Sequence, residues 1–273
     1  FQLYEVLIRS PWDCMAEHSS GSLEFGGSRV AWFREQRGPG PVICAAHPVE
    51  EFAEGTAALL ADVTGCSVVC VSTSDSQLSL EEMVVRVEEV RHELGYERWY
   101  YWGMSGGGWL SQLYARRYPE SLLGIVIESV CACFRVRLAD PECVLSPHYP
   151  VWREALSAKG VFDPAAHAKP SSGDGTEWVE IEGIGQVFRR VGGAALLVSP
   201  IAIGERMRVV MPRLWTFDAR EWLPDLNVPT LVMCGTADPL VPIEHARRVS
   251  QSIPAAKFVA IEGGGHVPTA ERS

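Results

Sequence analysis

The chain has 273 residues and lacks the features typical of membrane proteins and nucleic-acid-binding proteins. None of its apolar runs reaches the ~18 residues that a helix needs to cross a bilayer. Basic residues are in deficit, with 24 Lys and Arg against 34 Asp and Glu, so the formal net charge is −10. Nucleic acids and anionic membrane surfaces bind basic patches, so we expect neither as a partner.

Regular cysteine spacing is also absent, although the chain contains eight cysteines. Cys44, Cys70 and Cys234 fall inside apolar, strand-like runs, where we expect reduced and buried thiols. Cys131 and Cys133 form only a C-x-C pair, which is weak evidence for a metal, so we predict neither metal nor cofactor. Reduced thiols favour a cytoplasmic protein.

What the sequence does contain is an alternation of strand-like and helix-like runs. The strand-like runs are short and apolar: RVAWFREQ (29–36), PVICAA (41–46), SVVCVST (67–73), RWYYWGM (98–104), LLGIVIES (122–129), PTLVMCGT (229–236) and AKFVAIEG (256–263). Apolar spacing near 3.6 marks the helix-like runs: EEFAEGTAALLADV (50–63), SLEEMVVRVEEVRHEL (79–94), GGWLSQLYARRY (107–118) and EHARRVSQSI (244–253). This alternation predicts an α/β protein with a doubly wound, mostly parallel sheet.

The alternation stops between about Cys131 and Leu226, in a stretch rich in aromatic residues that includes the polar run KPSSGDGTE (169–177). We interpret this stretch as a cap subdomain inserted between two strands of the sheet. The predicted organisation is a core of residues 21–130 and 227–273, a cap of residues 131–226, and an N-terminal extension of residues 1–20.

A cap would cover the carboxyl edge of the strands, where open α/β sheets bind their ligands. Aromatic side chains line many small-molecule pockets, so Trp152 and Trp215 of the cap are candidate pocket residues. Met104 and His47 are the candidates from the core.

Ser105 stands between glycines in WYYWGMSGGGW (99–109), at a predicted strand-to-helix junction. Gly103 to Gly107 match G-x-S-x-G, a motif that holds a catalytic serine on a sharp turn in this context. Glycine at both ends gives room for that turn. A phosphate-binding loop does not fit, because no Gly-Lys-Ser/Thr follows and no G-x-G-x-x-G register exists. A plain flexible turn stays open from this segment alone.

A serine nucleophile needs a histidine base and a carboxylate that orients it. His266 follows the last strand-like run in EGGGHVP, where three glycines free the backbone to place an imidazole at the sheet edge. Asp238 follows the preceding strand-like run, in CGTADPLVP. The chain order Ser, Asp, His is that of α/β-hydrolases.

An oxyanion hole requires two N–H donors. The N–H of Gly106, directly after the serine, is the first candidate. The second should lie after the strand-like run at 41–46, where the chain reads His47-Pro48-Val49. Because Pro48 has no N–H, Val49 is the better candidate.

From about Gly21 to Pro268 the chain resembles the α/β-hydrolase superfamily, on the segments GMSGGG, GTADPLVP and GGGHVP in this order. The resemblance implies Ser105 as nucleophile, His266 as general base and Asp238 as orienting acid. It also implies the α/β-hydrolase fold, with a cap inserted after the sixth strand.

Two positions leave alternatives open. His47-Pro48 stands where the family usually has His-Gly, which puts the second oxyanion donor in doubt. Glu128 lies after the sixth strand, where some members carry an alternative acid.

The leading functional hypothesis is a serine hydrolase that cleaves a carboxylic ester or lactone of a small, largely apolar molecule through an acyl-enzyme on Ser105. Carbon–carbon bond hydrolysis, perhydrolysis and aminopeptidase activity use the same residues and stay open. Haloalkane and epoxide chemistry is disfavoured, because its nucleophile is an aspartate. A non-catalytic small-molecule receptor often lacks the histidine that is present here. The expected partner is a small-molecule substrate, and a homodimer formed through the cap is an open alternative.

Overall fold

A computed structural model describes residues 17–25, 28–47, 53–73, 78–160, 176–182, 185–190, 195–199, 214–254 and 256–271. The chain forms two compact units. The first contains Phe1–Ala132, Ala219–Asp238 and Ile243–Ser273, and the second contains Cys133–Asp218 and Pro239–Pro242.

In the described part of the first unit, an eight-stranded sheet has the order β1-β2-β4-β3-β5-β6-β10-β11. Its strands are β1 (Glu17–Phe25), β2 (Ser28–Gln36), β3 (Val42–His47), β4 (Ser67–Thr73), β5 (Trp99–Met104), β6 (Leu122–Glu128), β10 (Thr230–Gly235) and β11 (Ala256–Ile261). β2 pairs antiparallel with β1 and β4, and the other neighbouring strands are parallel. The predicted mostly parallel sheet is confirmed.

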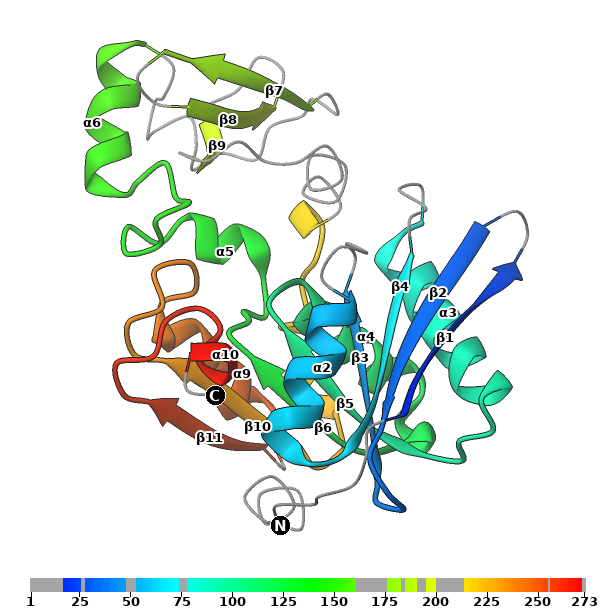
Figure 1. Ribbon diagram of the computed structural model, residues 1–273. Coiled ribbons are helices and arrows are strands. Elements are labelled where there is room, and N and C mark those ends of the chain that lie inside the picture. Colours follow the sequence, from blue (N-terminus) through cyan, green and yellow to red (C-terminus); the bar gives the residue numbers. More distant parts are fainter. Residues whose placement is uncertain are drawn as a thin grey trace. The chain divides into compact units, whose positions relative to one another are not determined.

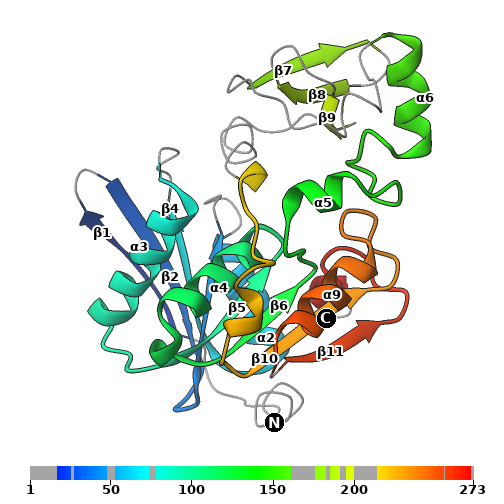
Figure 2. The ribbon, with the colours of Figure 1, turned by 180° about the vertical axis from the view of Figure 1, so that it is seen from behind.

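Helices cover both faces of this sheet, as Figures 1 and 2 show from opposite sides. The helical elements of the first unit are α2 (Ala53–Thr64), α3 (Leu80–Glu93), α4 (Gly106–Arg117), η2 (Pro119–Ser121), η3 (Leu223–Asp225), α9 (Ile243–Ser252) and α10 (Pro268–Glu271). α2 lies on one face, whereas α3, α4 and α9 lie on the other. The double winding that the sequence predicts is therefore present.

The central strands are apolar along nearly their whole length because helices cover both of their faces. In β6, for example, six of the seven residues are buried. One core cluster fills the space between α2 and the sheet; its buried residues are Ile43, Ala45, Ala57, Leu60, Ala61, Cys66, Val68, Cys70, Trp102, Val126 and Leu231. This core fixes the strands whose carboxyl ends carry the candidate site residues.

β1 is a strand that the sequence analysis did not predict. Its sequence, EHSSGSLEF, is mostly polar and lacks the apolar run by which the other strands were predicted. The strand lies at the sheet edge and is stabilised by pairing with β2. Gly21 faces Trp32 across this pair, and a Cβ there would lie 2.6 Å from the Trp32 ring. β1 begins at Glu17, inside the stretch that we treated as an extension, and residues 1–16 lie outside the described part.

The second unit contains α5 (Phe134–Leu138), α6 (Pro150–Ala158) and a three-stranded antiparallel sheet. The strands of this sheet are β7 (Thr176–Ile181), β8 (Gly185–Arg190) and β9 (Ala195–Ser199). The sequence analysis predicted no sheet here, although TEWVEI of β7 alternates polar and apolar residues. Most of the polar run at 169–177 lies outside the described residues.

Among the described residues, no helix is both long enough and apolar enough to cross a bilayer. The cysteines in the described ranges are buried and form no disulfide bonds with one another.

Candidate active site

Ser105 occupies a sharp turn between β5 and α4. Its backbone has φ 47° and ψ −116°, a conformation that non-glycine residues rarely adopt. Such strain costs about 1–3 kcal/mol and persists only where the surrounding structure enforces it. The turn directs Ser105 out of the carboxyl end of β5, at the edge where α/β sheets bind ligands.

The glycines beside Ser105 allow the backbone segments to approach one another closely. At Gly103 a Cβ would lie 2.5 Å from the Ser111 hydroxyl and 2.6 Å from the Gly107 carbonyl oxygen. At Gly107 a Cβ would lie only 2.3 Å from the carbonyl oxygen of Ala46 in β3. The first turn of α4 therefore packs directly against the ends of β5 and β3, and any larger residue at either position would force them apart.

One expected oxyanion donor lies within the described residues. Gly106 is the first residue of α4, so its N–H has no acceptor within the helix. His47 is the last residue of β3 and is partly buried, next to the residue whose carbonyl contacts α4. Val49 and Pro48 lie outside the described residues, so the structure does not test the second donor.

Asp238 and His266 follow adjacent parallel strands, β10 and β11, and backbone hydrogen bonds join their loops. The Thr236 N–H donates to the Ile261 carbonyl at 3.0 Å, and the Ala237 N–H donates to the Gly264 carbonyl at 2.9 Å. At Gly235 a Cβ would lie 2.0 Å from that same Gly264 oxygen. The close approach of the two loops thus requires glycine at 235.

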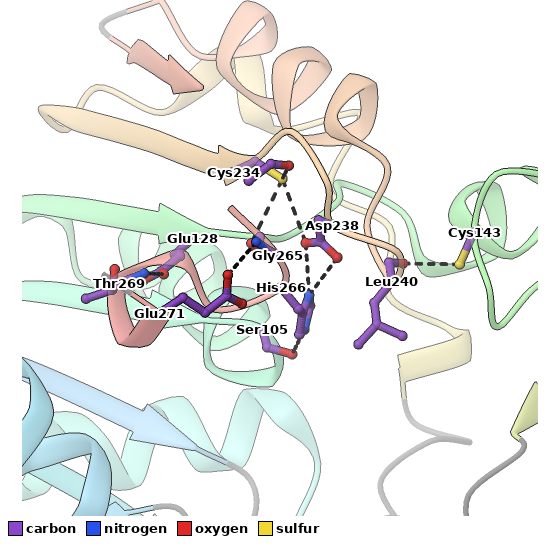
Figure 3. A network of polar contacts seen from close by, with 12 residues as sticks. Ser105, Glu128, Cys143, Cys234, Asp238, Leu240, Gly265, His266, Thr269 and Glu271 are labelled. Carbon is purple, nitrogen blue, oxygen red and sulfur yellow. Dashed lines mark hydrogen bonds and ion pairs between the residues drawn. The ribbon is translucent and has the colours of Figure 1, made fainter. Parts of the chain in front are cut away.

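The structure brings Ser105, His266 and Asp238 together in one line of hydrogen bonds (Figure 3). His266 Nε2 lies 2.8 Å from Ser105 Oγ. On its other side, His266 Nδ1 lies 2.9 Å from Asp238 Oδ2 and 3.1 Å from Oδ1. The Asp238 side chain is fully buried, whereas the His266 side chain keeps 18% of its surface exposed.

This geometry assigns the protons. An ionised carboxylate only accepts hydrogen bonds, so Nδ1 of His266 donates to Asp238. In the neutral imidazole Nε2 is then the acceptor, and it faces the hydroxyl of Ser105. An imidazole nitrogen is thus in contact with the serine hydroxyl, and a buried carboxylate is in contact with the imidazole; catalytic serines are activated by groups in this order.

Cys234 is a neighbour of Asp238 that sequence reasoning missed. Its Sγ lies 3.8 Å from Asp238 Oδ2 and 3.9 Å from the hydroxyl of Ser129. Burial, and next the charge of Asp238, raise the pKa of this thiol to about 12, so it stays protonated and can donate to the carboxylate. No sequence signal marks this contact, since Cys234 is one more apolar residue in its strand.

Glu128, the alternative acid, has its carboxylate bonded elsewhere. Oε2 accepts from the indole N–H of Trp102 at 2.8 Å, and Oε1 accepts from the backbone N–H of Thr269 at 3.0 Å. Burial raises the pKa of Glu128, and these hydrogen bonds and the charge of His266 act against that rise. Asp238, and not Glu128, holds the hydrogen-bonding position at Nδ1.

The candidate pocket residues lie in both units. Met104, the last residue of β5, is partly buried and packs against the core cluster. In the second unit, Trp152 of α6 donates its indole N–H to the Val144 carbonyl at 2.7 Å. Trp215 packs edge-on against Phe134, with ring centroids 6.5 Å apart. Both tryptophans thus have partners inside their own unit.

Comparisons with known proteins agree with this fold. A family model described as alpha/beta hydrolase fold matches residues 211–272. The pimeloyl-[acyl-carrier protein] methyl ester esterase of Aromatoleum aromaticum is 26% identical over 174 residues, which is 61% of this chain. The aligned stretch spans 66% of that esterase, just under two thirds of its length.

Solved structures match over most of the chain. An alpha/beta fold family hydrolase from Bacillus anthracis has a TM-score of 0.65 and 18% identity, covering 93% of this chain and 95% of its own. Est816, described as an N-acyl homoserine lactone degrading enzyme, has a TM-score of 0.58 and 15% identity, covering 92% and 95%. At these identities the similarity establishes the fold.

Proposed function

We propose that the chain is a member of the α/β-hydrolase superfamily and a serine hydrolase that cleaves carboxylic esters or lactones of small, largely apolar molecules. The observation that carries the proposal is the contact of His266 with both Ser105 and Asp238, at 2.8 and 2.9 Å. Relatives whose names state ester or lactone cleavage support the substrate class.

In the proposed acylation, Ser105 Oγ attacks the substrate carbonyl while His266 Nε2 takes its proton. The buried Asp238 stabilises the imidazolium that forms. Collapse of the tetrahedral intermediate breaks the bond to the leaving alcohol, which receives the proton from His266, and leaves an ester on Ser105. In a lactone the alcohol stays attached to the acyl group.

Deacylation repeats these steps with water. His266 takes a proton from water, the resulting hydroxide attacks the acyl carbonyl, and the proton returns to Ser105 Oγ as the acid leaves. In both halves negative charge develops on the carbonyl oxygen, and we propose the N–H of Gly106 as the first donor that stabilises it. We propose Val49 as the second donor, since it follows β3 closely in the chain.

We also propose that the second unit acts as a cap that shapes the substrate site. In the chain it follows the carboxyl end of β6, and open α/β sheets bind their ligands at the carboxyl ends of their strands. Trp152 and Trp215 are its proposed substrate contacts. Replacing either with Ala should raise KM for long-chain esters more than for acetate esters, and equal KM changes would argue against a pocket role.

The test of the main proposal is turnover of p-nitrophenyl esters of graded acyl length, followed by release of p-nitrophenolate. Native protein should hydrolyse them, and Ser105→Ala should lose the activity while keeping its thermal transition. Ser157→Ala is a matched control, because Ser157 is exposed on α6 of the second unit. A folded native protein without turnover of any ester or lactone would overturn the proposal. Activity that survives in Ser105→Ala would overturn the nucleophile.

A further inference from the structure

Glu128 is a buried carboxylate that the proposed reaction does not use. Its side chain has no exposed surface, at the end of a strand that is otherwise apolar. Burying a carboxylate costs several kcal/mol unless hydrogen bonds compensate. Its two compensating bonds come from Trp102, on the neighbouring strand β5, and from the backbone of Thr269, on α10.

The bond to Thr269 lies just beyond His266, after a glycine run that is held by its own hydrogen bonds. The Gly263 N–H donates to the Thr236 hydroxyl, the Gly264 carbonyl accepts from the Ala237 N–H, and the Gly265 N–H donates to the Glu271 carboxylate. Residues Gly263, Gly264 and Gly265 precede the histidine, and Gly263 has φ +67°. Ordering glycines has a high entropic cost, so their conformation requires anchors. After His266 in the chain, α10 has only four residues. A buried hydrogen bond from its Thr269 N–H to Glu128 connects this helix to the end of β6.

The backbone of Glu128 also holds the serine turn. The N–H of Ser105 donates to the Glu128 carbonyl oxygen at 3.0 Å, in the parallel pairing of β5 with β6. One residue is therefore bonded to the serine through its main chain and to the histidine segment through its side chain. Figure 3 shows the bond between the Glu128 carboxylate and Thr269 in the same network as His266.

We propose that Glu128 is a positioning residue for the Ser105–His266 pair. Its carbonyl fixes the serine turn, and its carboxylate fixes α10, which follows the histidine in the chain. The catalytic consequence rests on the proposed function, whereas the anchoring of α10 does not. A carboxylate is needed because both partners are N–H donors, and a glutamine amide can offer its oxygen to only one of them. The residue acts through His266 and contacts no reacting atom.

The experiment compares Glu128→Gln, which keeps one acceptor, with Glu128→Leu, which keeps none. Glu244→Gln on α9 is the matched control, because Glu244 is exposed and pairs with Arg247 on its own helix. Two readouts are taken on each folded variant: hydrogen exchange of the 263–271 segment, and kcat and KM for a p-nitrophenyl ester.

We expect exchange of the Thr269 amide to quicken in both Glu128 variants, most in Glu128→Leu, and kcat to fall about tenfold or more with KM nearly unchanged. In a Trp102→Phe background the glutamine oxygen is free to accept from Thr269. The double variant should therefore protect the Thr269 amide better than Glu128→Gln alone does. Its kcat should be less than ~3-fold below that of Trp102→Phe, a non-additivity that a merely structural role would not produce.

The outcomes separate the two proposals. Native-like exchange and kcat in folded Glu128 variants would overturn the positioning role. Loss of turnover in Glu128→Gln with activity retained in Asp238→Asn would make Glu128 the orienting acid and overturn it as well. Faster exchange at Thr269 in the Glu128 variants, together with a native protein that hydrolyses nothing, would support the anchoring and refute the hydrolase.

Discussion

Gly107→Ala adds one methyl group at the point where α4 meets β3, and its effect follows from the packing. The new Cβ would lie 2.3 Å from the Ala46 carbonyl oxygen, well inside the 3.0 Å that real Cβ contacts respect. A backbone oxygen in a central strand cannot turn aside, so α4 has to move. Overpacking of this kind costs about 1–3 kcal/mol.

For a chain of this size, a loss of about 2 kcal/mol lowers Tm by roughly 4–8 °C. Activity should fall further than stability, because the displaced turn carries Ser105 and the Gly106 N–H. A misplacement of ~1 Å at reacting groups costs about 10²-fold in rate. The assays are thermal unfolding by circular dichroism and the rate of labelling by a fluorophosphonate probe.

Gly55→Ala is the control for this prediction. Gly55 is exposed in α2, and a Cβ there meets nothing within 4 Å. Alanine favours a helix over glycine by about 1 kcal/mol, so this variant should be as stable as the native protein or more stable, with native labelling. A Gly107→Ala protein that unfolds and labels like the native one would refute the packing of α4 against β3.

Three further predictions use single residues. Asp238→Asn keeps the shape of the site but holds the imidazole of His266 in the wrong tautomer, so kcat for esters should fall about 10³–10⁴-fold; a loss below tenfold would mean that another carboxylate orients the base. Burial alone would raise the pKa of Glu88, but hydrogen bonds, first among them that of Arg91, lower it. Its stabilisation is therefore present above about pH 4.3 and is lost as the pH falls through the lowered folded pKa, so the urea midpoint should drop more steeply on acidification in native protein than in Glu88→Gln; parallel curves would contradict this. Finally, Cys234 should resist iodoacetamide at pH 8 until the protein unfolds, and rapid alkylation of folded protein, located by mass spectrometry, would show that the thiol is not buried.

The main sheet and its helices could be predicted because each central strand is a short apolar run with its own boundaries. SVVCVST at 67–73 coincides with β4, and LLGIVIES at 122–129 extends only one residue beyond β6. β1 escaped prediction because its residues are polar and its stability comes from pairing, which no local pattern records. The three-stranded sheet of the second unit was not predicted for a related reason. Its strands lie where the alternation of strand-like and helix-like runs has stopped, so no neighbouring pattern marks them as strands.

The candidate site was predicted from spacing and chain order, whereas its supporting contacts were not. Ser105, Asp238 and His266 each follow a predicted strand, so a parallel sheet places all of them at one edge. The bonds of Glu128 to Trp102 and Thr269 depend on side-chain directions at the end of β6. A sequence gives a strand's residues and faces, but it does not specify which donors converge on one carboxylate.

The central claim is that Ser105 is an activated nucleophile, and covalent labelling tests it most directly. Protein treated with a fluorophosphonate probe is digested, and the modified residue is located by peptide mass spectrometry. The account predicts a single adduct on Ser105, formed rapidly in native protein and at least ~10³-fold more slowly in His266→Ala. An adduct on another residue, or labelling of Ser105 that is equally fast without His266, would contradict it.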